Sequence, residues 1–427
     1  MKRSFFKIKN LMIFIVLILI LENCTVLSQF NHNKIKSDIV LTGLDVLSKT
    51  NFKILTGKRV GLITNQTGLD KNLRQNIDLF KKSNNVELNA VFSPEHGFKG
   101  TELAGKKILK PEHKYEDLVF HSLYGETKVP SSEMLKDLDI LVFDIQDIGI
   151  RSYTYISTMG LAMKAAANHN IEFIVLDRPN PIGGLRVEGN KLDIDYTSFI
   201  GMFPIPYVYG LTSGELANFI NEEVFLAKDR CKLKVVNMIN WSRDKLFEDT
   251  YLNWVPTSPH VPTMETPYYM VSTGILGELG VFSIGVGYTI PFQVIAAPWI
   301  DSKLISDEMN KLNLEGVNFR PINYTPYYSI YSGIPVNGVQ IYFTNLKTVN
   351  LYSLQFYFLE VHNKFYPEKN PFLLAEEKGI SMYDKAIGTS LIRKVFMNQN
   401  TYESVEKIIK KDVDSFRLIS KEFYLYE

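Results

Sequence analysis

Cysteine is scarce in this sequence, and neither sign of charge is in excess. Of 427 residues only Cys24 and Cys231 are cysteines, and Cys24 lies next to an N-terminal apolar run. No disulfide can therefore form within the folded part, where Cys231 is expected to be a partly buried structural thiol. Lys and Arg number 47 against 46 Asp and Glu, for a formal charge of +1. Because nucleic-acid binding requires a basic surface, this balance argues against a nucleic-acid partner.

Motifs for nucleotides, metals and serine nucleophiles are missing as well. The pair Gly183-Gly184 lacks the spacing of a dinucleotide fingerprint, and the sequence has no P-loop and no G-x-S-x-G elbow. The 7 histidines show no H-x-x-x-H spacing, so the sequence gives no support to a metal site. We therefore expect neither a cofactor nor a bound metal.

The N-terminus has the pattern of an export signal. Four basic residues precede an unbroken apolar run over 11–21, which is too short to span a membrane comfortably. Cys24 follows where bacterial lipoproteins are cleaved and acylated, although Glu22 and Asn23 fit that pattern poorly. We predict a signal peptide over 1–24 with Cys24 as the lipidation site. Ordinary signal-peptidase cleavage and an uncleaved anchor are the alternatives.

This signal predicts an exported protein. Its expected location is the periplasm, the membrane as a lipoprotein, or the medium after secretion. Any membrane attachment is expected through the N-terminus only.

Alternating strand and helix patterns begin near residue 38. Helical spacing covers 72–82 and 155–169, between short apolar runs that are typical of strands buried on both faces. The predicted strands are 59–64, 87–92, 139–144 and 172–177. This alternation favours right-handed crossovers and a doubly wound parallel sheet over 38–238. The mixed strand and helix patterns of 239–427 predict a smaller α+β domain.

Each predicted strand ends in polar residues, and a parallel sheet brings these ends to one edge, where ligands bind. Glu95 and His96 provide a titratable pair there. Arg151 and Tyr155, after the third strand, suit a ligand with apolar sugar faces and hydroxyl edges. A surface turn is the alternative for any one strand end alone. The four ends are Thr64-Asn65-Gln66-Thr67-Gly68, Ser93-Pro94-Glu95-His96-Gly97, Asp144-Ile145-Gln146-Asp147 and Asp177-Arg178-Pro179-Asn180-Pro181.

Seven stretches spread over the chain also match a known family in its order. They are 42–47, 61–68, 93–97, 143–151, 176–181, 256–259 and 384–389. Together they resemble the NamZ family, exo-β-N-acetylmuramidases that were long classed as a domain of unknown function. The resemblance implies a Rossmann-like N-terminal domain, a smaller C-terminal domain and an active site in the cleft between them. It also implies release of terminal N-acetylmuramic acid (MurNAc) from the non-reducing ends of peptidoglycan fragments.

Glycoside hydrolysis assigns roles to these residues. One carboxyl group protonates the leaving oxygen, and a second group attacks or activates water. We predict Glu95 as the acid, beside His96, with a pKa raised by apolar surroundings. Candidates for the second group are Asp144, Asp147, Glu188 and Glu278, and assistance by the substrate's N-acetyl group is the alternative. The predicted substrate-binding residues are Asn65, Gln146, Asp147, Arg151, Tyr155, Asp177, Arg178, Asn180 and Glu278.

One position departs from the family pattern. Val286 stands where many members have arginine. If that arginine binds the lactyl carboxylate of MurNAc, this chain uses another cation or prefers a different sugar. An exported muropeptide- or glycan-binding lipoprotein without turnover is therefore the alternative function, although the presence of Glu95 and His96 argues against it.

Overall fold

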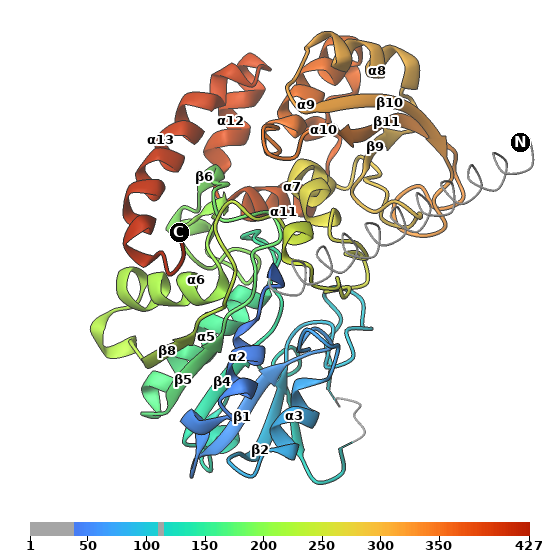
Figure 1. The fold of residues 1–427 in the computed structure, drawn as a ribbon. Coiled ribbons are helices and arrows are strands. Elements are labelled where there is room, and N and C mark those ends of the chain that lie inside the picture. The colour runs from blue at the N-terminus through green and yellow to red at the C-terminus, as the bar shows by residue number, and fades with distance from the viewer. Residues whose placement is uncertain (1–37, 110–114) are drawn as a thin grey trace, which may run out of the picture.

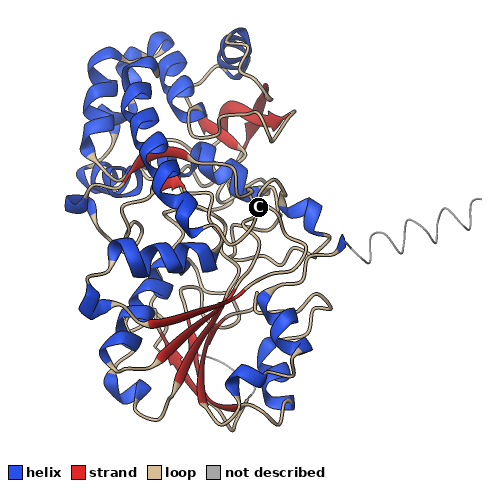
Figure 2. Ribbon diagram, turned by 60° about the vertical axis from the view of Figure 1, so that its left-hand side comes forward, coloured by secondary structure: helices blue, strands red, loops and turns tan. Residues whose placement is uncertain are grey.

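Six parallel strands form a twisted sheet in the N-terminal half of the chain (Figures 1 and 2). The computed structural model describes residues 38–109 and 115–427. The strands follow the order β3-β2-β1-β4-β5-β8, which runs outward from β1 in both directions and is the doubly wound arrangement. Their bounds are β1 Arg59–Thr64, β2 Glu87–Ser93, β3 Val119–Ser122, β4 Ile140–Asp144, β5 Glu172–Leu176 and β8 Lys232–Val236.

Helices cover both faces of this sheet, as Figure 2 shows. Alternate residues of a strand point to opposite faces, so Leu62 of β1 packs with Leu44 and Phe80, while Ile63 packs with the cluster around Met159. The first face carries α2 Gly43–Lys49 and α3 Asn76–Lys82, and the second carries α5 Tyr155–Asn168 and α6 Ser213–Phe219; α4 Ser132–Leu135 precedes β4. The predicted α/β class is confirmed.

The predicted strands are confirmed to within one residue at each end, whereas one predicted helix begins late. The helix expected from residue 72 begins at Asn76, because Asp70 holds the preceding segment in a turn. The Asp70 carboxylate accepts hydrogen bonds from the backbone N–H groups of Asn72 and Arg74, and Leu73 has a φ of 61°. A short aspartate side chain that binds its own backbone in this way competes with a helix.

The C-terminal half combines a small antiparallel sheet with helices, which appear in yellow to red in Figure 1. Its strands have the order β10-β11-β9. The elements are α7 Thr266–Gly277, β9 Val294–Ala297, α8 Ser302–Lys311, β10 Val317–Tyr324, β11 Val336–Phe343, α9 Leu354–Phe365, α10 Pro371–Leu374, α11 Glu377–Ile387, α12 Ser390–Gln399 and α13 Glu403–Ser420. This half therefore contains both strands and helices, as expected for the predicted α+β class.

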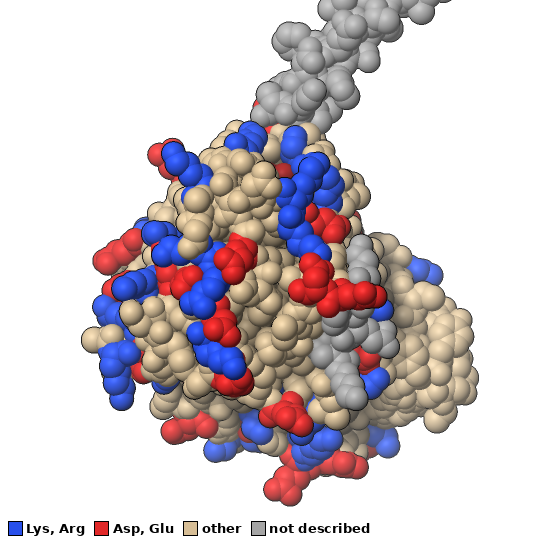
Figure 3. Space-filling model, turned by 90° about the horizontal axis from the view of Figure 1, so that it is seen from below, with Lys and Arg blue, Asp and Glu red and all other residues tan. Residues whose placement is uncertain are grey.

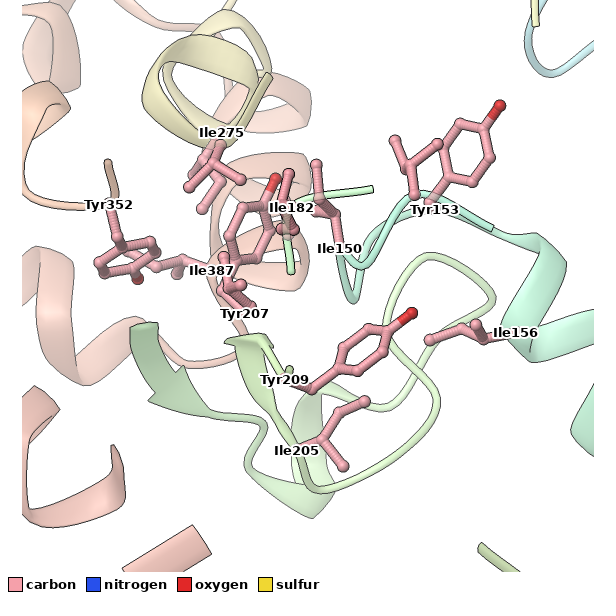
Figure 4. Packing of buried hydrophobic residues seen from close by; sticks show 14 of the residues in the cluster. Ile150, Tyr153, Ile156, Ile182, Ile205, Tyr207, Tyr209, Ile275, Tyr352 and Ile387 are labelled. Carbon is pink, nitrogen blue, oxygen red and sulfur yellow. The ribbon is translucent and has the colours of Figure 1, made fainter. Parts of the chain in front are cut away.

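The two halves share one hydrophobic core. A two-stranded sheet of β6 Glu188–Lys191 and β7 Pro206–Val208 lies between them. In Figure 4, Tyr207 of β7 lies close to Ile275 of α7 and Ile387 of α11, all three in the same buried cluster. Because this core runs through both halves, the domain boundary at residue 239 stays a prediction.

Charges of both signs are mixed over the surface seen from below (Figure 3), in keeping with the near-zero net charge. Within the described residues, no helix has the length and hydropathy needed to cross a bilayer.

Candidate active site

A cavity of about 320 Å³ lies between the two halves of the chain. The N-terminal half contributes the loop after β2, the start of α5 and β7. The C-terminal half contributes the Pro-rich loop over 254–263, α7 itself, the loop before β9 and the loop after β10. The polar and charged residues that line the cavity are Glu95, His96, Ser152, Tyr153, Thr154, Tyr207, Ser258, His260, Glu278 and Ser329.

Glu95 is fixed on both carboxylate oxygens. Its Oε1 accepts a hydrogen bond from the backbone N–H of Gly105 at 2.7 Å, and its Oε2 accepts one from Thr154 Oγ1 at 2.6 Å. The residue is 6% exposed. Thr154 directly precedes α5, so the loop between β4 and α5 positions a carboxylate from the loop after β2. The predicted convergence of strand ends is therefore confirmed for Glu95.

His96 lies beside Glu95 and also lines the cavity. It has a φ of 68°, a conformation that few non-glycine residues adopt. Its Nδ1 lies 2.6 Å from the carbonyl oxygen of Glu102. Since a carbonyl can only accept, Nδ1 carries a proton and donates it in this hydrogen bond.

Glu278 reaches the same cavity from the C-terminal end of α7. Its carboxylate makes no hydrogen bond or ion pair with another residue of the described ranges. The Glu278 side chain is exposed to solvent where it lines the cavity, and partial desolvation by the many protein atoms around it raises its pKa. A carboxyl group with a raised pKa and no fixed donor is suited to hold and release a proton.

The other three candidates for the second catalytic group lie elsewhere. Asp144 is fully buried in an ion pair with Arg178 Nε at 2.7 Å. Asp147 accepts hydrogen bonds from Gly149 N–H and the Tyr209 hydroxyl, and burial raises its pKa to about 6.

Glu188 borders a different cavity. It pairs with Arg186 and accepts the backbone N–H of Tyr352 at 2.8 Å, and the cavity that it lines, of about 470 Å³, does not include Glu95. Of the four candidates, only Glu278 shares a cavity with Glu95.

Comparison with known proteins identifies the family of the chain. The model of the N-terminal part of exo-β-N-acetylmuramidase NamZ matches residues 60–265, and the model of its C-terminal part matches 268–426. The chain belongs to the NamZ family. It is 39% identical over 391 residues to the peptidoglycan β-N-acetylmuramidase NamZ of Bacillus subtilis strain 168, with 92% of each chain covered. The predicted family and enzyme class, a glycoside hydrolase, are thus confirmed.

Two crystal structures of proteins from Bacteroides fragilis NCTC 9343 share the fold. Both are described as DUF1343 family proteins. One superposes with a TM-score of 0.86 at 47% identity, covering 91% of this chain and 100% of its own. The other has a TM-score of 0.70 at 29% identity, covering 91% and 99%.

Arg151 does not reach the NamZ-family cavity, contrary to its predicted place among the substrate ligands. It is fully buried, and its Nη1 donates to the carbonyls of Asn190 and Ile205, each at 2.7 Å. Its Nη2 donates to the carbonyls of Ala386 and Ile387. Burial lowers its pKa to about 10. Arg151 therefore joins the N-terminal half to the end of α11 rather than presenting a free guanidinium.

Most other predicted ligands also serve to hold the loops in place. Each of their side chains is engaged within the protein, and none lines the cavity. Asn65 accepts from the backbone and hydroxyl of Thr67, Gln146 donates to the carbonyls of Asp147 and Pro179, Tyr155 donates to the Thr257 carbonyl, Asp177 accepts from Thr212 and Tyr426, Arg178 pairs with Asp144, and Asn180 donates to the Leu211 carbonyl. They connect the strand ends to one another and to the Pro-rich loop.

Sequence reasoning missed several residues that line the cavity. Ser258 and His260 belong to the Pro-rich loop, whose family match was their only signal in the sequence. That loop is anchored by hydrogen bonds from Tyr153 and Gln66. No lysine or arginine is among the described residues that line the cavity, and Val286 is among them. The position that departs from the family pattern therefore faces the cavity.

Proposed function

We propose that the protein is an exo-acting glycoside hydrolase that releases terminal β-linked MurNAc from the non-reducing ends of peptidoglycan fragments. The observation that carries this proposal is that Glu95 and Glu278 line the same cavity in two different environments. A pair of carboxyl groups whose surroundings differ in this way divides into a proton donor and a carboxylate. Family membership supplies the sugar and the linkage.

The geometry favours Glu278 as the proton donor, which reverses the sequence-based assignment of Glu95. Glu278 protonates the glycosidic oxygen as the bond from the sugar's anomeric carbon to that oxygen breaks. Glu95 accepts hydrogen bonds on both oxygens and so acts as the carboxylate. In this role it attacks the anomeric carbon, activates the incoming water or orients the substrate's acetamido group. Thr154 and Gly105 keep it in place.

The direct test uses the purified mature chain with aryl β-glycosides of MurNAc and N-acetylglucosamine (GlcNAc). The MurNAc glycoside is expected to be hydrolysed faster, and a chelator is expected to leave its rate unchanged. Reducing-end analysis of intact glycan strands should show release from chain ends only. Equal cleavage of internal linkages, complete loss with chelator, or no turnover of either glycoside would contradict the proposal.

We also propose export as a lipoprotein acylated at Cys24, a residue that lies outside the described ranges. The supporting pattern is the basic segment followed by the apolar run over 11–21. Cys24→Ala is expected to move the protein from the membrane to the soluble fraction, with Cys231→Ala as the control. Unchanged membrane partition of the Cys24 variant would identify the apolar run as an uncleaved anchor.

A further inference from the structure

Three tyrosine rings form a stack that runs from the protein interior to its surface. Tyr324 is buried and its hydroxyl lies 2.7 Å from Ser283 Oγ. Its ring lies 4.7 Å from that of Tyr288, at an interplanar angle of 31°. The Tyr288 ring in turn lies 5.6 Å from that of Tyr327, at 29°. The inner end of the stack is thus anchored in the core, and the outer ring packs on the middle one.

The outer end of this stack lies next to residues of the cavity wall. Ser329 and Ile330, which follow it in the loop between β10 and β11, line the cavity. The hydroxyl of Tyr328 lies 2.8 Å from Nε2 of His260, another lining residue, and the two rings are stacked. Tyr327 and Tyr328 therefore lie at the edge of the cavity.

A glycine allows the loop that carries Tyr288 to pack closely against the loop that carries Tyr327 and Tyr328. Gly287 lies between Val286, which lines the cavity, and Tyr288 of the stack. Its carbonyl accepts the backbone N–H of Tyr327 at 2.8 Å. With a φ of 92°, and with an added Cβ only 2.0 Å from the carbonyl oxygen of Tyr328, this position excludes any side chain. The two loops are thus locked together beside the cavity.

Both outer tyrosines nevertheless remain open to solvent. Tyr327 is 72% exposed and Tyr328 is 49% exposed. A single exposed aromatic ring is ordinary, but two fixed rings at the edge of a catalytic cavity present flat apolar faces with hydroxyl groups beside them. The C–H faces of pyranose rings pack on such surfaces, and their hydroxyl groups match the polar edges.

We propose that Tyr327 and Tyr328 form the subsite for the sugar on the leaving-group side of the scissile bond, an N-acetylhexosamine pyranose. This inference rests on the proposed function. A cavity of about 320 Å³ accommodates one substituted pyranose. The next ring of the glycan must then lie outside it, where the tyrosines are.

The test compares Tyr327→Ala with Tyr327→Phe on two substrates, the disaccharide MurNAc-β-1,4-GlcNAc and β-MurNAc fluoride. Removing the ring is expected to lower kcat/KM for the disaccharide about tenfold, the value of one aromatic stacking contact. The Phe variant keeps the ring face and should keep the rate. The fluoride, whose leaving group has no ring to pack on the tyrosines, should react as with the unmodified protein. Tyr342→Ala, an exposed tyrosine of β11 that does not line the cavity, is the control.

Equal loss on both substrates would assign Tyr327 a structural role and overturn the subsite, as would no loss on either. If the unmodified protein hydrolyses neither substrate, the proposed function fails, and calorimetric titration with the same disaccharide then decides the subsite. A roughly tenfold weaker Kd in Tyr327→Ala supports it, and equal affinity overturns it.

Discussion

Glu278→Gln is expected to lower kcat for MurNAc-β-1,4-GlcNAc by about 10²-fold to 10⁴-fold, the usual contribution of a general acid. The amide has the size of the carboxyl group but no proton to give to the leaving oxygen. An aryl glycoside with an activated phenolate needs little protonation, so the variant should hydrolyse it at a nearly normal rate. Glu315→Gln, an exposed glutamate in the loop after α8, is the matched control.

The pH profile supplies a second readout for Glu278. The protonated form is the active one, and burial raises its pKa above that of an ordinary glutamate. Activity on the disaccharide should therefore persist to higher pH than an unperturbed glutamic acid would allow. It should fall as the pH rises through the raised pKa. The Gln variant should lack this alkaline limb. A variant that retains the limb, or loses both substrates equally, would show that Glu278 is not the acid.

The strands could be predicted from sequence because their burial is local and complete. Runs such as 140–144 are apolar at every position up to a terminal aspartate, and the helices on the two sides of the sheet bury both faces. Strand β3 was not predicted, since its four residues at the sheet edge are only partly buried. The late start of α3 depended on side-chain hydrogen bonds of Asp70, which apolar periodicity does not record.

The roles of polar residues at strand ends were harder to predict from sequence. Glu95 and Arg151 carry the same signal in the sequence, a charged side chain just after a buried strand. One reaches the cavity, whereas the other binds carbonyl groups of Ala386 and Ile387, more than 200 residues later in the chain. No local sequence pattern around Arg151 predicts hydrogen bonds to carbonyl groups so far along the chain. Glu278 shows the reverse case, since a residue named only as one of four candidates is the one that lines the same cavity as Glu95.

The role of Glu95 is decided by a second substitution, Glu95→Gln. Both carboxylate oxygens now accept hydrogen bonds, from Gly105 N–H and Thr154 Oγ1, and an amide can accept on one side only. The variant loses the charge and one fixed contact, so hydrolysis of the disaccharide and of the aryl glycoside should both fall by about 10²-fold or more. Thermal unfolding should show an intact fold. Glu102→Gln, a substitution in the same loop whose side chain pairs with Lys106, is the control.

Together, the two substitutions show which carboxyl group is the proton donor and what the other one does. If Glu95→Gln spares the aryl glycoside and Glu278→Gln does not, Glu95 is the proton donor, as the sequence alone predicted, and Glu278 is its partner. If Glu95→Gln reduces both rates and external azide restores the aryl reaction, the side chain attacks the anomeric carbon or activates water, because a small anion can replace either function. If both rates fall and azide does not restore the aryl reaction, Glu95 orients the acetamido group of the substrate. Near-normal rates on every substrate would remove Glu95 from the chemistry altogether, since no hydrogen-bonded carboxylate that touches the reacting atoms can lose its charge without cost.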